Sequence, residues 1–118
     1  MKIETTPIKD LIIINPSVYE DNRGYFFESF HKDKFQQLTD TEVNFLQDNE
    51  AFSNRGAIRG LHFQKGQFAQ AKLVRVVKGK VLDIAVDLRS GSKTFGKHFS
   101  IILSEENKKQ LFVPRGFA

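Results

Sequence analysis

The sequence predicts an all-β domain of the sandwich or barrel type, and three observations support this class. Short apolar runs recur at intervals of roughly 8–12 residues, and each run ends at a group of turn-forming residues. Residues 81–88 alternate between two sets of side chains with period two, as in a half-buried strand. Only one short segment has helical character, and 118 residues is the length of one domain.

Four strands and one helix are expected in the first half of the chain. Asn15 and Pro16 stop the first apolar run, and a turn at residues 21–24 precedes an aromatic-rich run. A brief, weakly amphipathic segment between the second and third strands is the only expected helix. The expected strands span residues 11–14, 25–30, 43–48 and 58–64, and the expected helix spans residues 32–38.

A hairpin is the clearest expectation for the second half of the chain. Residues 71–77 and 81–88 are strand-like runs on either side of the turn formed by Lys78 and Gly79. Two more strands are expected at residues 98–103 and 111–113, which brings the total to about eight.

Composition excludes several classes of protein. The chain has no Cys, so it has no disulfide framework, no thiolate metal site and no thiol nucleophile. No run approaches the length of a membrane span, and the N-terminus has no apolar signal core, so a cytoplasmic protein is expected. The formal net charge of +4 favours an acidic small-molecule partner, such as a phosphorylated compound, over nucleic acid or a membrane.

Among the three histidines, His62 is the candidate for chemistry near neutral pH. On a strand its side chain would share a face with Gly60 and Gln64, which leaves room for a ligand. A satisfied core histidine fits the spacing equally well, whereas surface or capping roles fit His31 and His98 better. The amide of Gln64 stands where a second metal-binding His would be needed, which argues against a metal site.

Charged residues on the expected strands provide a second set of candidates. Lys72 would share a face with apolar neighbours, which is costly unless the ammonium is paired, functional or snorkels to solvent. Asp83 and Asp87 are expected on the polar side of a half-exposed strand, or as partners of nearby Lys and Arg.

Seven segments, taken in order, resemble the dTDP-4-dehydrorhamnose 3,5-epimerase family, and the resemblance extends from about Ile8 to the last residue. These segments are residues 21–28 (DNRGYFFE), 45–49 (FLQDN), 59–64 (RGLHFQ), 71–74 (AKLV), 83–89 (DIAVDLR), 94–96 (TFG) and 114–118 (PRGFA).

The resemblance implies a fold, a reaction and a set of site residues. The fold would be a cupin-type jelly roll, working as a homodimer without metal or other cofactor. The reaction would be 3,5-epimerisation of dTDP-4-dehydro-6-deoxy-D-glucose to dTDP-4-dehydro-L-rhamnose, by removal of protons next to the 4-keto group. By motif match His62 is the base, Lys72 stabilises the enolate, and phenylalanines help form the thymine pocket. The matched substrate-binding residues are Arg23, Glu28, Gln47, Asp48, Asn49 and Arg59.

The sequence also departs from the family pattern. Family members are longer, and beyond the Gly-Phe-Ala segment they supply a substrate-contacting His, a proton-donor Tyr and an Asp that supports the base. We therefore expect residues 1–118 to be a single jelly-roll domain, incomplete at its C-terminus. The chain would be either part of a longer protein or a truncated form, and by itself weakly active or inactive.

Four alternative functions remain open from the sequence. A C3-only epimerase or a 3,4-ketoisomerase would use the same scaffold. A non-catalytic module that binds sugar nucleotides would need no proton donor. A small basic barrel that binds nucleic acid is the fourth, since basic and aromatic residues interleave in places.

Overall fold

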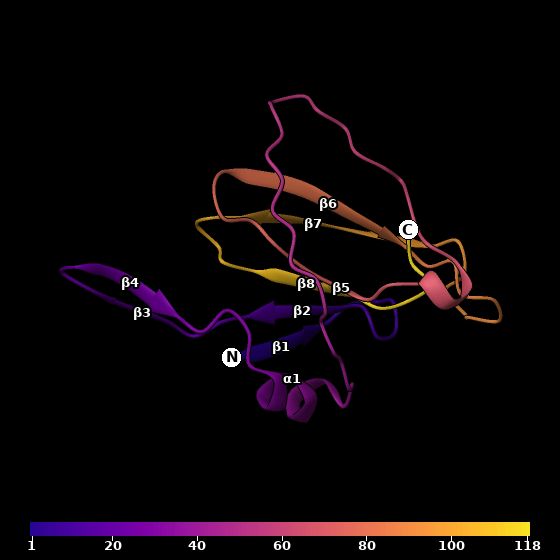
Figure 1. Ribbon diagram of the computed structural model, residues 1–118, viewed down its shortest axis with the longest axis horizontal. Coiled ribbons are helices and arrows are strands. Elements are labelled where there is room, and N and C mark those ends of the chain that lie inside the picture. Colours follow the sequence, from indigo (N-terminus) through magenta and orange to yellow (C-terminus); the bar gives the residue numbers. More distant parts are fainter.

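The computed structural model describes residues 1–118 and contains eight strands, one α-helix and one 3-10 turn (Figure 1). The strands are β1 (Lys2–Thr5), β2 (Ile12–Asn15), β3 (Val18–Asp21), β4 (Gly24–Phe27), β5 (Lys72–Arg75), β6 (Lys80–Val86), β7 (His98–Ser104) and β8 (Gln110–Val113). The helix α1 spans Lys32–Thr39, and the 3-10 turn η1 spans Gly66–Phe68.

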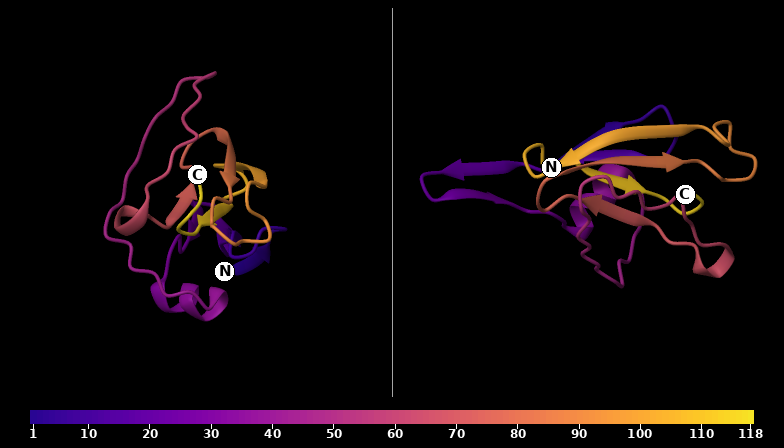
Figure 2. Two further views of the ribbon diagram at one scale, coloured as in Figure 1. Left: turned by 90° about the vertical axis from the view of Figure 1, so that its right-hand side faces the viewer. Right: turned by 90° about the horizontal axis from the view of Figure 1, so that it is seen from above.

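The largest sheet is antiparallel and has the strand order β1-β2-β8-β5. Side chains of β2 alternate between its two faces. Ile13 joins a buried cluster on the side of β6 and β7, whereas Ile12 and Ile14 pack with Phe35 of α1 on the other side. The sheet is therefore the middle layer, between the β6–β7 pair and the helix (Figures 1 and 2).

The hairpin formed by β3 and β4 stands apart from this layered body. Its two strands pair only with each other, and Figures 1 and 2 show it projecting away from the main sheet. The turn of the hairpin, at Asn22 and Arg23, is therefore its far end. Tyr19, Tyr25 and Phe26 are exposed along it.

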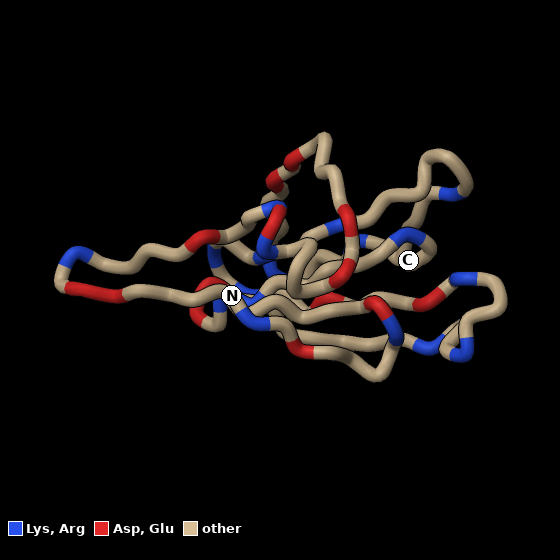
Figure 3. Tube along the Cα trace, turned by 90° about the horizontal axis from the view of Figure 1, so that it is seen from below, with Lys and Arg blue, Asp and Glu red and all other residues tan.

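Charges of both signs are spread along the chain rather than gathered in one basic stripe (Figure 3). Neither α1 nor η1 has the length and apolarity that crossing a bilayer requires.

The predicted hairpin of residues 71–77 and 81–88 is wrong in its pairing. Both strands exist, but β5 pairs with β8 and β6 pairs with β7. The two strands belong to different layers. Leu73 of β5 lies opposite Phe112 of β8 within the middle sheet, whereas Ala85 of β6 packs onto one face of that sheet. The turn at Lys78 and Gly79 thus connects two layers rather than two neighbours in one sheet.

Two other expected strands, at residues 43–48 and 58–64, are not formed. Both lie in the long segment between α1 and β5, where η1 is the only regular structure. A strand needs a neighbour for its backbone N–H and C=O groups, and neither run has one in this structure. The strands β1 and β3, which are both largely polar, were not predicted. Because they replace the two missing strands, the total is still eight.

The remaining predictions of elements are confirmed within a few residues. The helix lies at Lys32–Thr39, with Phe35 as its only buried side chain. It ends where Asp40 adopts a left-handed conformation (φ 51°) and its N–H donates to Gln36. The runs at 11–14, 25–30, 98–103 and 111–113 correspond to β2, β4, β7 and β8.

The two faces of β6 are the reverse of the expected arrangement. Ala85 and Asp87 are buried, whereas Leu82 and Ile84 are 63% and 42% exposed. The face that carries the aspartates is thus the inner face, so Asp83 and Asp87 do not form a solvent-facing polar side. The alternative expectation, that they are partners of basic residues, is confirmed for Asp87, which binds Arg89.

Candidate active site

Lys72 begins β5 and points into the space between the main sheet and the β6–β7 pair. Side chains on a strand alternate, and Leu73 packs on the helix side while Val74 packs on the β6–β7 side. Lys72 shares the face of Val74 and is half-buried. Its ammonium is thus the cationic end of an otherwise apolar interior face.

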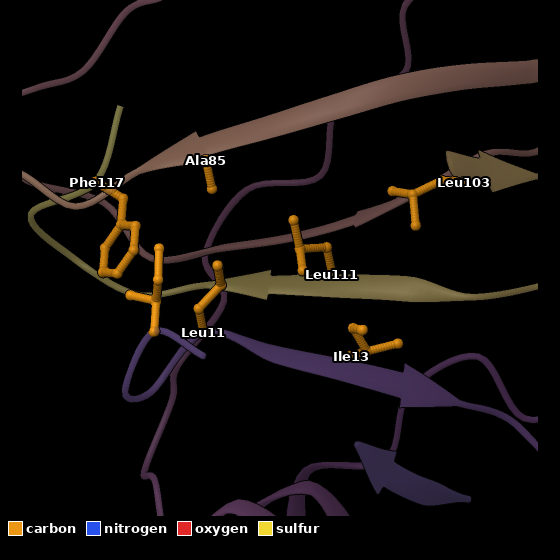
Figure 4. Packing of buried hydrophobic residues seen from close by; sticks show 7 residues of the cluster. Leu11, Ile13, Ala85, Leu103, Leu111 and Phe117 are labelled. Atoms are coloured by element: carbon orange, nitrogen blue, oxygen red, sulfur yellow. The ribbon is translucent and has the colours of Figure 1, made fainter. Parts of the chain in front are cut away.

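Asp83 approaches the same space from the opposite layer. It shares the inner face of β6 with Ala85, which points toward Leu111 of the middle sheet (Figure 4). Its cross-strand neighbour Ile101 packs on the same cluster. Burial raises the pKa of the Asp83 carboxyl, while a backbone hydrogen bond at Ile84 and the charge of Lys72 act in the other direction.

His62 lies in the segment between α1 and β5 and is exposed rather than set in the wall of a barrel. The absence of strand pairing at residues 58–64 is the physical reason, because no sheet fixes the direction of the ring. Gly60 lies close to the imidazole. A Cβ atom built on it would be 3.2 Å from Nδ1 of His62, and its φ of +107° also favours glycine.

The expected binding residues of this segment make local contacts. Arg59 donates from Nε to the Ser53 hydroxyl (2.8 Å) and from Nη2 to the Phe52 carbonyl (3.0 Å). Gln47 donates to the Asn49 side-chain oxygen at 3.1 Å. Like His62, these residues are exposed, as is Asp48. One continuous segment therefore carries the imidazole, a guanidinium and three amide or carboxylate groups, and it leads directly into Lys72.

Arg23 and Glu28 are in a different part of the molecule. Arg23, whose side chain is 90% exposed, pairs with Asp21 at 2.6 Å. This hydrogen bonding lowers the pKa of the Asp21 carboxyl. Glu28 follows β4 and pairs with Lys34 of α1 at 2.8 Å, an interaction that lowers the pKa of Glu28.

Strand register shows that Arg23 and Lys72 are far apart. Leu73 lies opposite Phe112, and Phe112 lies opposite Ile12, so Lys72 is level with the start of β2. The β3–β4 hairpin leaves from the other end of β2, after Asn15. Four residues of sheet and a four-residue hairpin separate them by about 25 Å. Within one chain, the structure does not bring Arg23 to the same ligand as Lys72.

The proximity of Asp83 to Lys72 was not predicted from the sequence. The alternation in residues 81–88 places Asp83 on the same face of the strand as Ala85. Without the pairing of β6, however, nothing in the sequence showed that this face was the inner one.

A second buried charge, Asp87, has a different set of contacts. It is fully buried and accepts hydrogen bonds from Arg89 (3.0 Å), Ser92 (2.6 Å) and Thr94 (2.7 Å). These bonds, led by the one from Arg89, hold the pKa of Asp87 well below its usual range. Its carboxylate has no spare acceptor for a ligand, so this cluster is part of the scaffold.

The layered antiparallel strands form a cupin-type jelly roll, the fold of the solved structures that this chain resembles. Residues 5–118 match the family described as dTDP-4-dehydrorhamnose 3,5-epimerase. The chain belongs to this family.

Individual relatives agree with the family match. The dTDP-4-dehydrorhamnose 3,5-epimerase of Escherichia coli K12 is 47% identical over 118 residues. The crystal structure of dTDP-4-dehydrorhamnose 3,5-epimerase from Elizabethkingia anophelis NUHP1 is 55% identical, with a TM-score of 0.95 over 100% of this chain. The enzyme of Legionella pneumophila Philadelphia 1, solved in complex with dTDP-4-keto-L-rhamnose, is 48% identical, with a TM-score of 0.95 over 99% of this chain.

The chain is shorter than these relatives. It spans 64% of the length of the E. coli protein, 64% of the E. anophelis chain and 62% of the L. pneumophila chain.

Proposed function

We propose that this protein is a sugar-nucleotide 3,5-epimerase that acts on dTDP-4-dehydro-6-deoxy-D-glucose. The observation that carries the proposal is the place of Lys72, which is half-buried on the face of β5 that packs against the β6–β7 pair and follows the segment bearing His62. A relative with 48% identity was crystallised with dTDP-4-keto-L-rhamnose, which supports the substrate class.

The chemistry needs a base and a positive charge near a ketone. The His62 imidazole takes the proton from the carbon next to C4, and the C–H electron pair moves into the new C=C bond. The carbonyl π pair collapses onto the C4 oxygen, where the Lys72 ammonium stabilises the negative charge. A proton then returns to the opposite face of the carbon, which inverts it. General base catalysis contributes roughly 10²–10⁴-fold, and one donor aimed at the developing oxyanion contributes about 3–4 kcal/mol.

Substrate binding is assigned to the polar groups of the same segment. The planar guanidinium of Arg59 suits the diphosphate, to which it can bind with two parallel hydrogen bonds. Gln47, Asp48 and Asn49 offer donors and acceptors to the sugar and nucleotide. The exposed phenylalanines Phe52 and Phe63 are available to stack on thymine.

We further propose a homodimer in which the β3–β4 hairpin of one subunit reaches the site of the other. Arg23 and Glu28 match substrate-binding positions of the family, yet Arg23 lies about 25 Å from the level of Lys72 in its own chain, and Glu28 lies at the base of the same hairpin. An isolated two-stranded hairpin is marginally stable in water, and its exposed aromatic side chains favour a covering surface. A second copy provides both the cover and a nearby ligand for Arg23.

Mixing variants tests the shared site. In a mixed dimer of Arg23→Ala and His62→Ala subunits, one site has both substitutions and the other has neither. Equal amounts of the two subunits, unfolded and refolded together, should regain about a quarter of the wild-type activity. Sites built within single chains would leave the mixture as inactive as the separate variants. Sedimentation of the wild type as a monomer would also overturn the dimer.

Solvent-deuterium incorporation tests the reaction itself. Because residues 1–118 are expected to be weakly active or inactive by themselves, the assay uses the protein expressed from its complete gene. With the 4-keto sugar nucleotide in D₂O, this protein should place deuterium at both C3 and C5. His62→Ala should reduce the rate by at least 10²-fold with the fold intact. His98→Ala is the matched control, because His98 is exposed on β7 and has no assigned role. Near wild-type incorporation by His62→Ala would refute the assignment of the base.

The alternatives predict other results in the same assay. A C3-only epimerase would label C3 alone, and a 3,4-ketoisomerase would yield a 3-keto product by NMR. A binding module would bind thymidine diphosphate without exchange. A nucleic-acid-binding barrel would prefer oligonucleotides, with an affinity that falls steeply with salt; the dispersed charges argue against it (Figure 3).

Three further parts of the proposal concern the chain as a whole. Residues 1–118 act as one domain, since β2 contributes to both hydrophobic clusters. The reaction needs no metal or other cofactor, because the base and the positive charge are both side chains. The absence of cysteine is consistent with a cytoplasmic location.

A further inference from the structure

We propose that Asp83 is a positioning residue for Lys72, holding the ammonium toward the interior where the enolate oxygen would form. This inference rests on the proposed epimerase function. It gives a role to a carboxyl group that no other part of the site accounts for.

The first observation is the orientation of the two side chains. Lys72 lies on the face of β5 that carries Val74, and Asp83 lies on the face of β6 that carries Ala85. Val74 and Ala85 pack in the same cluster. The two charged residues therefore extend one shared interior surface from opposite layers, close enough for the charge of Lys72 to act on the Asp83 carboxyl.

The second observation is that neither group has an ion-pair partner and that one oxygen of the Asp83 carboxyl has no hydrogen-bond donor. Asp83 Oδ2 is buried and makes no hydrogen bond. All five ion pairs of the structure involve other residues, so neither Lys72 nor Asp83 is paired within 4.0 Å. A buried acceptor without a donor costs about 1–3 kcal/mol. A half-buried carboxyl with one unsatisfied oxygen reduces stability, which makes a functional role the better explanation of its position.

Coulombic attraction explains what the carboxyl can do. The long side chain of Lys72 could otherwise snorkel to solvent from the end of β5. A carboxylate on the facing layer favours the conformers in which the ammonium stays inside. It leaves the ammonium free to bind an oxyanion, because the two groups are not in direct contact.

A structural role and a positioning role predict opposite effects of Asp83→Asn. A stabilising interior ion pair would lower the melting temperature when it is removed. Burial raises the pKa of the Asp83 carboxyl, so the neutral amide should leave the melting temperature unchanged or raise it. Loss of positioning should instead lower kcat by about 10- to 100-fold, with KM within about twofold. Asp83→Glu, which restores the charge, should recover part of the lost kcat.

A chemical readout separates this inference from the proposed function. Acetic anhydride acetylates neutral amines, and mass spectrometry gives the rate at Lys72 relative to exposed Lys78 in the same chain. Asp83→Asn should raise that ratio several-fold, whereas the matched control Glu42→Gln, at an exposed carboxylate, should leave it unchanged. This comparison needs no turnover.

The outcomes are distinct. An active wild type with unchanged kcat and unchanged Lys72 reactivity in Asp83→Asn overturns the role of Asp83 but leaves the epimerase. A wild type without deuterium exchange overturns the epimerase, while the Lys72 reactivity still decides whether Asp83 governs the amine. If Asp83→Asn does not fold, the carboxylate is structural and the inference is wrong; Asp83→Ser provides the second variant that confirms this.

Discussion

Replacing Asp87 by asparagine is expected to destabilise the protein by about 3 kcal/mol. Asp87 is fully buried and accepts hydrogen bonds from the Arg89 guanidinium, the Arg89 backbone N–H, and the hydroxyls of Ser92 and Thr94. Loss of one partner from a buried ion pair costs about 3–5 kcal/mol. Asparagine keeps the shape and one acceptor, which places it at the lower end of that range.

Asp10→Asn is the matched control for this measurement. Asp10 also pairs with Arg89, at 2.7 Å, but on the exposed side of the guanidinium. Exposed ion pairs contribute about 0.2–1 kcal/mol. Asparagine also tolerates the positive φ of Asp10 (70°). The two substitutions therefore each remove one carboxylate that pairs with Arg89: the buried carboxylate of Asp87 and the solvent-exposed carboxylate of Asp10.

Urea unfolding monitored by circular dichroism gives both free energies, and thermal melts should show a drop of roughly 10 °C for Asp87→Asn. Equal losses for the two variants, or a loss below about 1 kcal/mol for Asp87→Asn, would show that burial does not determine the strength of this pair.

Acid titration extends the same prediction. The folded-state pKa of Asp87 is well below that of the unfolded chain, so the charged form favours the folded state. Its contribution is fully present above about pH 5, and it is lost as the pH falls toward the folded-state pKa. The wild type should thus lose stability below about pH 4 more steeply than Asp87→Asn. Parallel pH profiles of the two proteins would contradict this account.

Three further predictions concern glycine sites and the core. Gly116→Ala should cost about 2 kcal/mol or more in urea unfolding, because φ is +88° and the new Cβ would lie 2.6 Å from Arg89 Cγ; an unchanged midpoint would contradict it. Gly60→Ala should lower kcat about tenfold by crowding the His62 ring, with unchanged melting; full activity would show that the ring does not need this space. Phe35→Ala should cost about 3–5 kcal/mol, since Phe35 is fully buried against Phe112, whereas Phe95→Ala, at an exposed ring, should cost little.

The elements that the sequence predicted correctly are those whose signals are local. The strand at 98–103 and the helix at 32–38 depend on side-chain periodicity and on nearby turn residues, which any short window contains. The strands at 43–48 and 58–64 have the same local signal but lack a partner strand. Propensity alone does not form a strand without hydrogen-bonded neighbours.

The site shows the same division. His62, Lys72 and Arg59 were identified from motifs, and these assignments stay predictions until variants are measured. The neighbour of Lys72 could not be identified, because Asp83 reaches it only through the packing of two layers. The separation of Arg23 from Lys72 also depends on register across β2, β8 and β5.

By itself, the sequence determined the all-β class, the positions of most strands, the single helix and the membership of an epimerase family. It could do so because hydrophobic alternation, turn residues and ordered motifs are properties of short stretches of chain. Only the tertiary structure decided that β5 pairs with β8, that Asp83 and Asp87 face inward, and that the β3–β4 hairpin projects from the body. Strand pairing and layer packing are contacts between segments that are far apart in the sequence. Their free energy therefore depends on both segments together and cannot be inferred from either one alone.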